Sequence, residues 1–392
     1  MDEVRMVRES YPEPAPPTAR EIAQAKALLS EPPRRSLPRL RWGLGGVLAA
    51  AAAATVAITL AGGNAVVGGN APVGGNAVGP QPGTVNLDAK GAILAAAEKA
   101  EEQPTGKYWY IDQIDGQSYI MRPKTGTYAI TGAHSETFGW WGAKPGMGEA
   151  FYGRDLAAHP SSPADVALWK GAGSPSSFRV WSSDHYYTYT AKSTKWQAHG
   201  QTNASGGGDF PGGISAEDLR NLPTDPAKLA ERFLSDMEMG KALGRKPQDP
   251  AGHQQYPGVK IMRVASLLAA PLPPKVRAGL MRALADQPGI HSIGRVTDPL
   301  GRRGVALAAD DRAFTVTGEF GAPKAEQGTY RSRAVIVFDE RTGAVLSEQE
   351  ALTKPGGPYA EMKPGFIINY LTLRSAQWTD TKPTPPAELP FS

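Results

Sequence analysis

The sequence predicts an α+β protein, in which a curved, half-barrel-like antiparallel sheet is packed with helices and preceded by one transmembrane helix. Three observations support this prediction. Short runs of aromatic and β-branched residues recur between residues 108 and 378, separated by Asp, Ser and Gly, which is typical of antiparallel strands. Apolar residues recur at helical spacing within residues 225–239 and 264–289. Residues 42–61 contain no charged side chain.

Residues 42–61 have the length of a membrane-spanning helix, since twenty residues rising 1.5 Å each cover about 30 Å, the thickness of a bilayer core. Basic residues crowd the segment just before it, at positions 34, 35, 39 and 41, and the next one after it is Lys90. The positive-inside rule therefore places residues 1–41 in the cytoplasm and the C-terminal domain outside the cell membrane. This predicts a single-pass protein whose residues 42–61 have the lipid bilayer as their partner.

Two alternatives to a stable membrane span are less favoured. A cleaved signal peptide would need a basic region of 41 residues, longer than a whole peptide of about 15–30 residues. A buried Ala-rich helix of a soluble protein would not explain the arginines before it or the glycines after it. The chain has no Cys, so a lipid-anchored lipoprotein, disulfides and cysteine nucleophiles are excluded.

The segments that flank the span have distinct compositions. In the cytoplasmic tail, Thr18 and Glu21 form a capping-box pattern before a short helix at 19–29, which is marginal alone and would fray or dock on a cytoplasmic protein partner. Residues 62–84 are a Gly/Asn-rich linker with three copies of Gly-Gly-Asn-Ala. These copies are too few for a β-helix, so we expect a flexible tether spanning roughly 25 Å.

The extracytoplasmic α+β domain is predicted to cover residues 85–378. It begins with a helix from Leu87 that Pro104 stops, followed by two strands around an Asp115-Gly116 hairpin turn. The other expected strands are 127–130, 178–181, 186–190, 195–197, 290–297, 304–309, 314–318, 334–338, 344–350 and 366–378. Two further helices are expected to begin at Ser215 and at Asp225, the second running to Met239. Two more are expected at 264–270 and 274–289, and a loop is expected at 206–213. Residues 379–392 are Pro-rich and predicted to be disordered.

Charge and motifs argue against several functions. Residues 1–41 carry eight Lys/Arg and six Asp/Glu, a net charge of +2. The rest of the chain carries 34 Lys/Arg and 32 Asp/Glu, again a net charge of +2, and its basic residues form no stripe. Nucleic-acid binding is therefore not expected. No serine-hydrolase, zinc-protease or phosphate-loop motif occurs, so the sequence predicts no enzyme, no catalytic, cofactor-binding or metal-binding residues, and no cofactor.

A few residues invite a functional reading beside a structural one. The six histidines are scattered, and His185 beside Asp184 would face the other side of a strand, which favours a surface role over a metal ligand or base. Tyr187 and Tyr189 would share one face and Tyr186 the other, where they could line a lipid or glycan groove but more often pack in a core.

Four further features have structural readings that we favour. The Trp140-Trp141 pair is interpreted like the tyrosines, as core before groove. The glycines at 206–208 could form an anion nest, but a plain flexible loop is favoured. The polar turns that begin with Asp298 and Asp339 lack the ligands of a calcium site and read as ordinary turns.

Three stretches resemble a family of uncharacterised actinobacterial single-pass membrane proteins, known mainly by a locus-tag name. They are DEVRMVRESYPEP in the tail, LLAAPLPPKVRAGLMRALADQPGIHSIGRVTDPLGRRGVALA within 264–350, and RAVIVFDERTGAVL. The resemblance implies a cell-membrane location and genes that often neighbour those of sigma factors, and it supplies no catalytic residues. The order of elements also resembles the half-barrel of periplasmic lipoprotein carriers and the sensor domains of anti-sigma regulators.

The resulting hypothesis is a non-enzymatic, membrane-anchored envelope protein whose outer domain binds an extracytoplasmic ligand or protein, with a tail that passes a signal inward. The alternative is a lipid or lipoprotein carrier with an apolar groove lined by the aromatic strands. A third possibility is an envelope hydrolase without a recognisable motif.

Overall fold

The computed structural model describes residues 87–198, 203–210, 214–236, 238–239 and 256–384. None of the helices within these ranges combines the length and the hydropathy that crossing a bilayer requires. The predicted tail, span and linker at 1–41, 42–61 and 62–84 lie outside the described residues, as do the last eight residues of the predicted Pro-rich tail.

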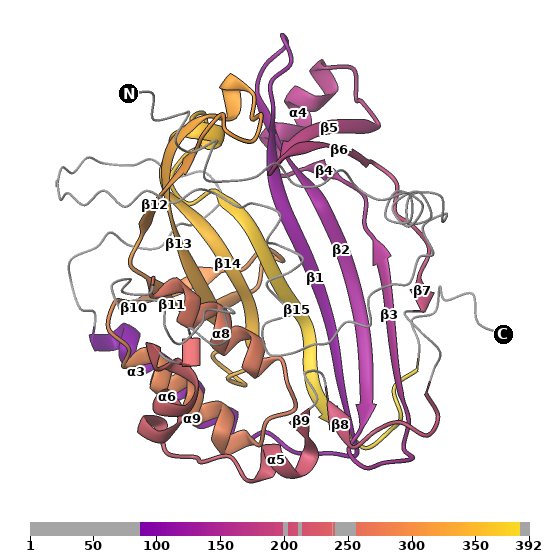
Figure 1. Ribbon diagram of the computed structural model, residues 1–392, viewed down its shortest axis with the longest axis vertical. Helices are drawn as coiled ribbons and strands as arrows, with labels where there is room; N and C mark the ends of the chain where they lie inside the picture. The colour runs from indigo at the N-terminus through magenta and orange to yellow at the C-terminus, as the bar shows by residue number, and fades with distance from the viewer. Residues whose placement is uncertain (1–86, 199–202, 211–213, 237, 240–255, 385–392) are drawn as a thin grey trace, which may run out of the picture. The chain divides into compact units, whose positions relative to one another are not determined.

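The described chain is α+β, as the sequence predicts, and a large antiparallel sheet of eleven strands dominates it (Figure 1). The strand order is β10-β11-β13-β14-β15-β1-β2-β3-β7, with β12 paired to β13 and β4 paired to β2. The sheet is open, because β10 and β7 pair on one side only among the described strands. Two-stranded sheets are formed by β5 with β6 and by β8 with β9.

The strands are β1 (Tyr108–Met121), β2 (Tyr128–Gly142), β3 (Glu149–Asp155), β4 (His159–Pro160), β5 (Ser177–Ser182), β6 (His185–Thr190), β7 (Gln197–Ala198), β8 (Asp209–Phe210), β9 (Ile214–Ser215), β10 (Ile290–Thr297), β11 (Arg303–Ala309), β12 (Arg312–Val316), β13 (Gly328–Phe338), β14 (Val345–Lys354) and β15 (Ile367–Thr379). The helices are α3 (Leu87–Glu101), α4 (Pro163–Gly171), α5 (Ala216–Arg220), α6 (Pro226–Leu234), α8 (Gly258–Leu268) and α9 (Pro274–Ala285), with 3-10 turns η2 (Lys324–Glu326) and η3 (Gly357–Tyr359).

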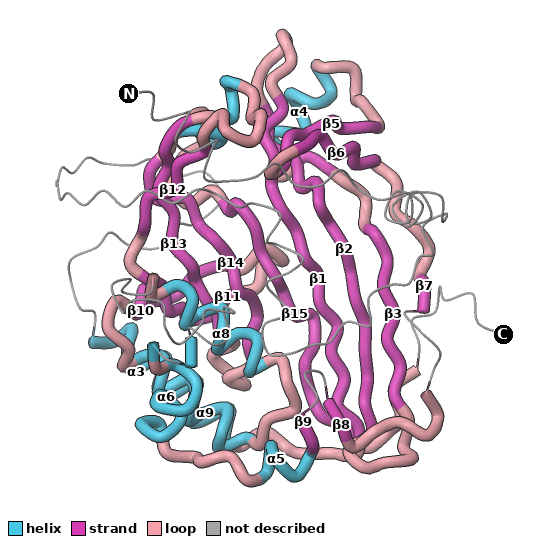
Figure 2. Tube along the Cα trace, viewed as in Figure 1, coloured by secondary structure: helices cyan, strands magenta, loops and turns pink. Residues whose placement is uncertain are grey.

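Helices cover one face at the β10 end of the sheet. Helix α8 packs on β11, β13 and β14, and α3 packs on β10, β11 and α9. Figure 2 shows these helices gathered on that side, away from β2 and β3. The main apolar core lies between them and the sheet, and the predicted stripe of Val276, Leu280 and Leu284 on α9 is fully buried there. Leu94, expected on the buried face of α3, is instead 37% exposed.

The helix starts follow capping rules, whereas one predicted helix end is wrong. Asp225 accepts the Lys228 N–H at 3.0 Å and Pro226 occupies the first turn, as the sequence predicts for α6. Helix α6 ends at Leu234, because Ser235 takes an extended conformation with ψ 151°, and residues 236, 238 and 239 are helical again, so the predicted helix to Met239 is interrupted at Ser235.

The predicted hairpin at Asp115-Gly116 is wrong. Both residues lie inside the continuous strand β1, which pairs with β15 on one side and β2 on the other. The glycine serves close packing rather than a turn, because a Cβ on Gly116 would lie 2.3 Å from the Tyr370 ring. The loop expected at 206–213 likewise holds strand β8 and leads into β9.

The first long strand pairs with the last one. Tyr108 of β1 lies opposite Thr379 of β15, and the ladder continues to Gln117 opposite Asn369, with one β-bulge between Asp112 and Gln113. The centre of the sheet is therefore built from residues more than 250 positions apart.

Candidate ligand-binding cleft

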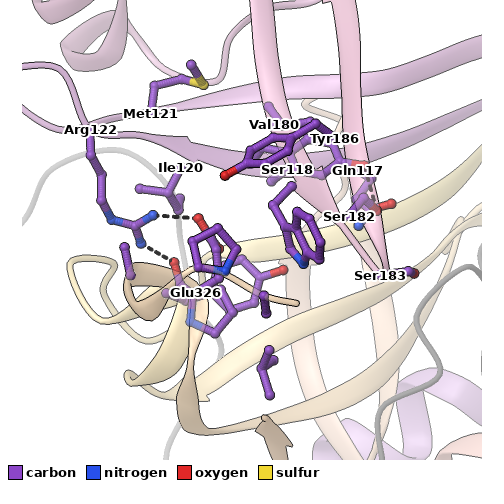
Figure 3. Close-up of a pocket in the computed structure, with 18 of the residues that line it drawn as sticks. Gln117, Ser118, Ile120, Met121, Arg122, Val180, Ser182, Ser183, Tyr186 and Glu326 are labelled. Atoms are coloured by element: carbon purple, nitrogen blue, oxygen red, sulfur yellow. Dashed lines mark hydrogen bonds and ion pairs between the residues drawn. The ribbon is translucent and has the colours of Figure 1, made fainter. Parts of the chain in front are cut away.

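A cleft of about 300 Å³ opens where three distant segments meet. One wall is the end of β1 at residues 117–122, the second is the β5–β6 hairpin, and the third combines residues 315–326 with η3. Figure 3 shows Ser182, Ser183 and Tyr186 of the hairpin on one side and Glu326 on the other. A volume of 300 Å³ lies at the lower end of the range for small-molecule sites.

The hairpin that forms one wall turns tightly. Ser183 has φ +60°, and the Asp184 N–H donates to Ser182 O at 2.9 Å across it. Beyond the turn the strand alternates, so Tyr187 and Tyr189 share a face and stack at 6.2 Å, as the sequence predicts. Both pack against a small core, whereas Tyr186 on the opposite face is 42% exposed and lines the cleft. The core and groove readings therefore apply to different tyrosines.

Arg179 and two aromatic rings make the hairpin wall both apolar and cationic. The Arg179 guanidinium carbon lies 3.6 Å from the Tyr186 ring centroid, a cation–π contact. The Trp181 ring meets Tyr186 edge-on at 5.1 Å. Arg179 forms no ion pair with a carboxylate in the part of the chain that the structure describes, so its charge is available to a ligand.

The two other walls carry an exposed aromatic ring and an arginine that is already paired with carboxylates. Phe320 is 46% exposed at the cleft. Arg122 binds Glu326 at 2.9 Å and Glu361 at 2.8 Å, and donates to Pro358 O at 2.6 Å. Burial raises the pKa of Glu326 even though Arg122 opposes the shift. Arg122 is thus paired with two glutamates, whereas Arg179 has no carboxylate partner among the described residues.

Tyr119 adds a polar group at the base of the hairpin wall. Its hydroxyl lies 3.4 Å from Ser182 Oγ and 3.3 Å from the Tyr189 hydroxyl. Burial raises the pKa of Tyr119, so the phenol stays protonated and remains a hydrogen-bond donor at any physiological pH. The cleft thus offers aromatic faces, hydroxyls and one free guanidinium, which suits recognition of a ligand rather than bond cleavage.

Three carboxylates lie on the helix-side face of the sheet. Asp115 and Glu348 both lie opposite Leu371 on neighbouring strands, so their side chains share the face of Leu371. Glu350 follows two residues after Glu348 on β14 and therefore lies on the same face. Burial raises the pKa of Glu348 to about 8, of Glu350 to about 7 and of Asp115 to about 6, with Glu350 and Asp115 adding repulsion at Glu348. At neutral pH Glu348 therefore holds its proton, Glu350 is about half protonated and Asp115 is mostly ionised, and the three groups give this face a polar patch beside the apolar core.

The histidines differ from the sequence-based expectation in two ways. Asp184 lies in the turn and not on a strand, so its carboxylate reaches back to His185 Nδ1 at 2.7 Å instead of facing away. The two side chains are 67% and 55% exposed, consistent with the favoured surface role. His134 and His159, which no sequence spacing connects, lie with ring centroids 5.3 Å apart. Burial lowers the pKa of His134.

Two other candidates have structural roles. The N–H groups of Gly206 and Gly208 donate to the carbonyls of Asn203 and Gly142, so they are not free to form an anion nest. Asp298 and Asp339 begin the turns of the β10–β11 and β13–β14 hairpins and accept backbone N–H groups there, as ordinary turn residues do.

Trp140 and Trp141 face opposite sides of β2. Trp140 is 2% exposed in a cluster with Tyr152 and Trp196, and Trp141 packs against the main core. The favoured core reading therefore holds for this pair. Within the described ranges, no three His, Asp or Glu side chains come close enough to hold a metal ion together.

Comparison with known proteins gives little. No protein-family model matches this chain, and no curated protein sequence is similar to it. Among solved structures, the chain is similar to one in the complex of MucA and MucB from Pseudomonas aeruginosa, with 11% identity over 74% of this chain and 57% of that chain, less than two thirds of its length. The TM-score of 0.19 is too low for an argument about fold or function.

Sequence reasoning identified the Tyr186 strand but not the cleft. Arg179 carried a readable signal, since it alternates with Phe178 and Val180, which are buried, and must therefore face the other side. Phe320 gave no signal, because it lies in a turn outside any periodic element.

Proposed function

We propose that this chain is a non-enzymatic, membrane-anchored envelope protein whose outer domain binds a small ligand in the cleft. The ligand would carry a flat ring or another apolar group together with an acidic group. The observation that carries the proposal is the wall of Arg179, Tyr186 and Trp181, which faces Phe320 across a space of ligand size.

The chemistry of this wall explains the ligand class. Exposed aromatic rings gain most when they cover an apolar or ring surface, because burial removes both surfaces from water. A guanidinium without a carboxylate partner favours an anionic oxygen, which it can bind through two parallel N–H groups. Tyr186 already orders Arg179, so less side-chain entropy is lost when a ligand binds.

The test uses the full chain in detergent, studied by native mass spectrometry and by calorimetric titration with small aromatic and sugar acids. We expect a co-purifying or titrating ligand whose affinity falls at least tenfold in Trp181→Ala and in Arg179→Ala. Arg295→Ala is the matched control, since Arg295 is 74% exposed, pairs with Glu340 and does not line the cleft. A ligand whose affinity is the same in all three variants would place binding elsewhere, and no ligand of this class at all would refute the proposal.

The carrier alternative is less favoured. It requires a half-barrel-like sheet whose inner face holds an acyl chain. The helix-side face is filled with α3, α8 and α9 at one end and carries Asp115, Glu348 and Glu350 next to them. An acyl chain laid over these groups could not hydrogen-bond to them and would remove them from water, which is costly even for protonated carboxyls.

The membrane and signalling parts of the proposal are supported by the sequence alone. The uncharged segment 42–61, the arginines before it and the resemblance to proteins encoded near sigma factors support an anchored protein whose tail contacts a cytoplasmic protein. A chain lacking residues 1–31 should reach the membrane yet fail to restore the phenotype of a deletion strain. Full rescue by this shortened chain would contradict a signalling role for the tail.

A further inference from the structure

A second aromatic surface lies far from the cleft, on β1, β2 and β3. We define it by Tyr108, Tyr110, Phe138, Trp140 and Tyr152. Cross-strand ring pairs connect them, with centroids 5.9 Å apart for Tyr108 and Trp140, and 6.2 Å apart both for Tyr110 and Phe138 and for Phe138 and Tyr152. Tyr108, Tyr110 and Phe138 are half-buried, so parts of their rings face outward.

Trp140 on this surface lacks a hydrogen-bond partner. The side chain is 2% exposed, and its indole Nε1 finds no acceptor among the described residues. The indole N–H can only donate, and leaving it buried without an acceptor costs about 1–3 kcal/mol. A carbonyl oxygen is the group that this surface lacks.

The C-terminal end of the described chain already touches the aromatic surface. Strand β15 ends at Thr379, and three residues later Lys382 Nζ lies 4.9 Å from the centroid of the Trp140 ring. Whatever follows Lys382 therefore starts beside Trp140.

The ten residues that follow have a composition suited to such a surface. They read Pro-Thr-Pro-Pro-Ala-Glu-Leu-Pro-Phe-Ser, residues 383–392, with four prolines. Proline-rich segments favour the polyproline II conformation, whose carbonyls form no internal hydrogen bonds and whose rings dock on aromatic side chains. At about 3.1 Å per residue, ten residues reach about 31 Å, whereas Phe138 lies only two positions, about 7 Å, along β2 from Trp140.

We propose that residues 383–392 dock on the aromatic surface of their own chain as a proline-rich strap, with a strap carbonyl accepting the Trp140 Nε1–H. The tether through Lys382 keeps the local concentration of the strap high, so even weak contacts hold it in place. The aromatic surface is then a binding site for proline-rich polypeptide that the chain itself occupies.

The test places a nitroxide on the strap of the full chain. The chain has no Cys, so Ala387→Cys gives a single labelling site. We expect a slow, broadened electron paramagnetic resonance spectrum in the parent. Replacing the four strap prolines with glycine, which leaves the sheet untouched, should give a fast, narrow spectrum.

Two further variants report on the sheet side. Trp140→Phe keeps an aromatic ring but removes the N–H, and should lower the docked-to-free ratio about fivefold, the equivalent of one hydrogen bond. Trp141→Phe, which removes an indole N–H on the opposite face of β2, is the matched control and should leave the spectrum unchanged. A label that is fast in the parent, or equally slow after the proline replacements, would overturn the proposal. Release of the label when the protein is diluted would assign the strap to a second copy and would also overturn it.

Discussion

Removing the Asp298 carboxylate should destabilise the domain strongly. Its side chain is fully buried and accepts the N–H groups of Leu300 at 3.0 Å and Arg302 at 2.8 Å, as well as the Arg302 guanidinium at 2.5 and 2.8 Å. Arg302 in turn fixes two neighbouring strands by donating to Leu346 O and Leu373 O. Asp298→Ala therefore removes the acceptor of two backbone N–H groups and leaves the Arg302 guanidinium, which is 30% exposed, without its counter-charge.

The magnitude follows from these contacts. Each hydrogen bond to a charged acceptor contributes about 1.5–3 kcal/mol, and breaking a buried ion pair costs about 3–5 kcal/mol. Water can reach part of Arg302, so we expect a loss of about 3–4 kcal/mol in the free energy of unfolding. The assay is guanidinium titration of the full chain in detergent, followed by tryptophan fluorescence.

Asp339→Ala is the matched control in the equivalent turn of the β13–β14 hairpin. Asp339 also accepts two backbone N–H groups, from Arg341 at 2.7 Å and Thr342 at 3.3 Å, but Arg341 is 87% exposed and 4.0 Å away. Its loss should cost about 1 kcal/mol. Adding Arg302→Met to Asp298→Ala should restore part of the stability, because it removes the unpaired charge. Equal losses in the two aspartate variants would refute the reasoning.

Three further predictions concern stability, each read from the same guanidinium titration. Gly116→Ala should lower the free energy of unfolding by at least about 2 kcal/mol, because a Cβ would lie 2.3 Å from the Tyr370 ring. The control Gly91→Ala has open space around it in α3 and should raise the free energy of unfolding by about 0.5–1 kcal/mol. A neutral Gly116→Ala would contradict the packing argument. Burial raises the pKa of Glu348 from 4.5 to about 8, so the folded state keeps a proton that the unfolded state releases, and stability should fall as pH rises from about 4.5 to 8, by a few kcal/mol at most. Glu348→Gln should flatten that slope, and an unchanged slope would refute the assignment. Arg277→Met should cost about 2–3 kcal/mol, because the buried guanidinium donates to two carbonyls at the end of α8; a loss below 0.5 kcal/mol would show that water replaces it.

Local patterns were enough to predict the fold class and most elements of the C-terminal half. Strand β10 matches its predicted range, and the two polar turns lie where Asp298 and Asp339 mark them. Helix α4 was missed although its start is readable, since Ser162 caps Asp165 N–H and Pro163 opens the first turn. Its apolar residues are too few for a helical stripe, and none of its side chains is buried.

The pairing partners and the cleft were beyond local patterns. Asp115-Gly116 has the composition of a hairpin turn, but β15 and β2 on either side hold it in an extended strand, so tertiary pairing overrides the turn preference. The cleft combines residues near 120, 180 and 320, and only the fold brings these three positions together. The free charge of Arg179 likewise depends on which acids the fold places near it.

The pairing of β1 with β15 sets the order in which the domain can be completed. A chain emerging from the ribosome presents β1, β2 and β3 well before β15, so one edge of β1 has no neighbour until residues 367–379 have been made. An open edge along a strand of fourteen residues is a template for association with other chains, and this strand begins with the apolar run Tyr108-Trp109-Tyr110-Ile111. Such a long-range closure also slows folding, because the loop entropy is lost before the ladder forms. Premature termination before residue 367 should therefore yield aggregates rather than a smaller folded domain, and we expect nascent chains of this protein to need chaperones.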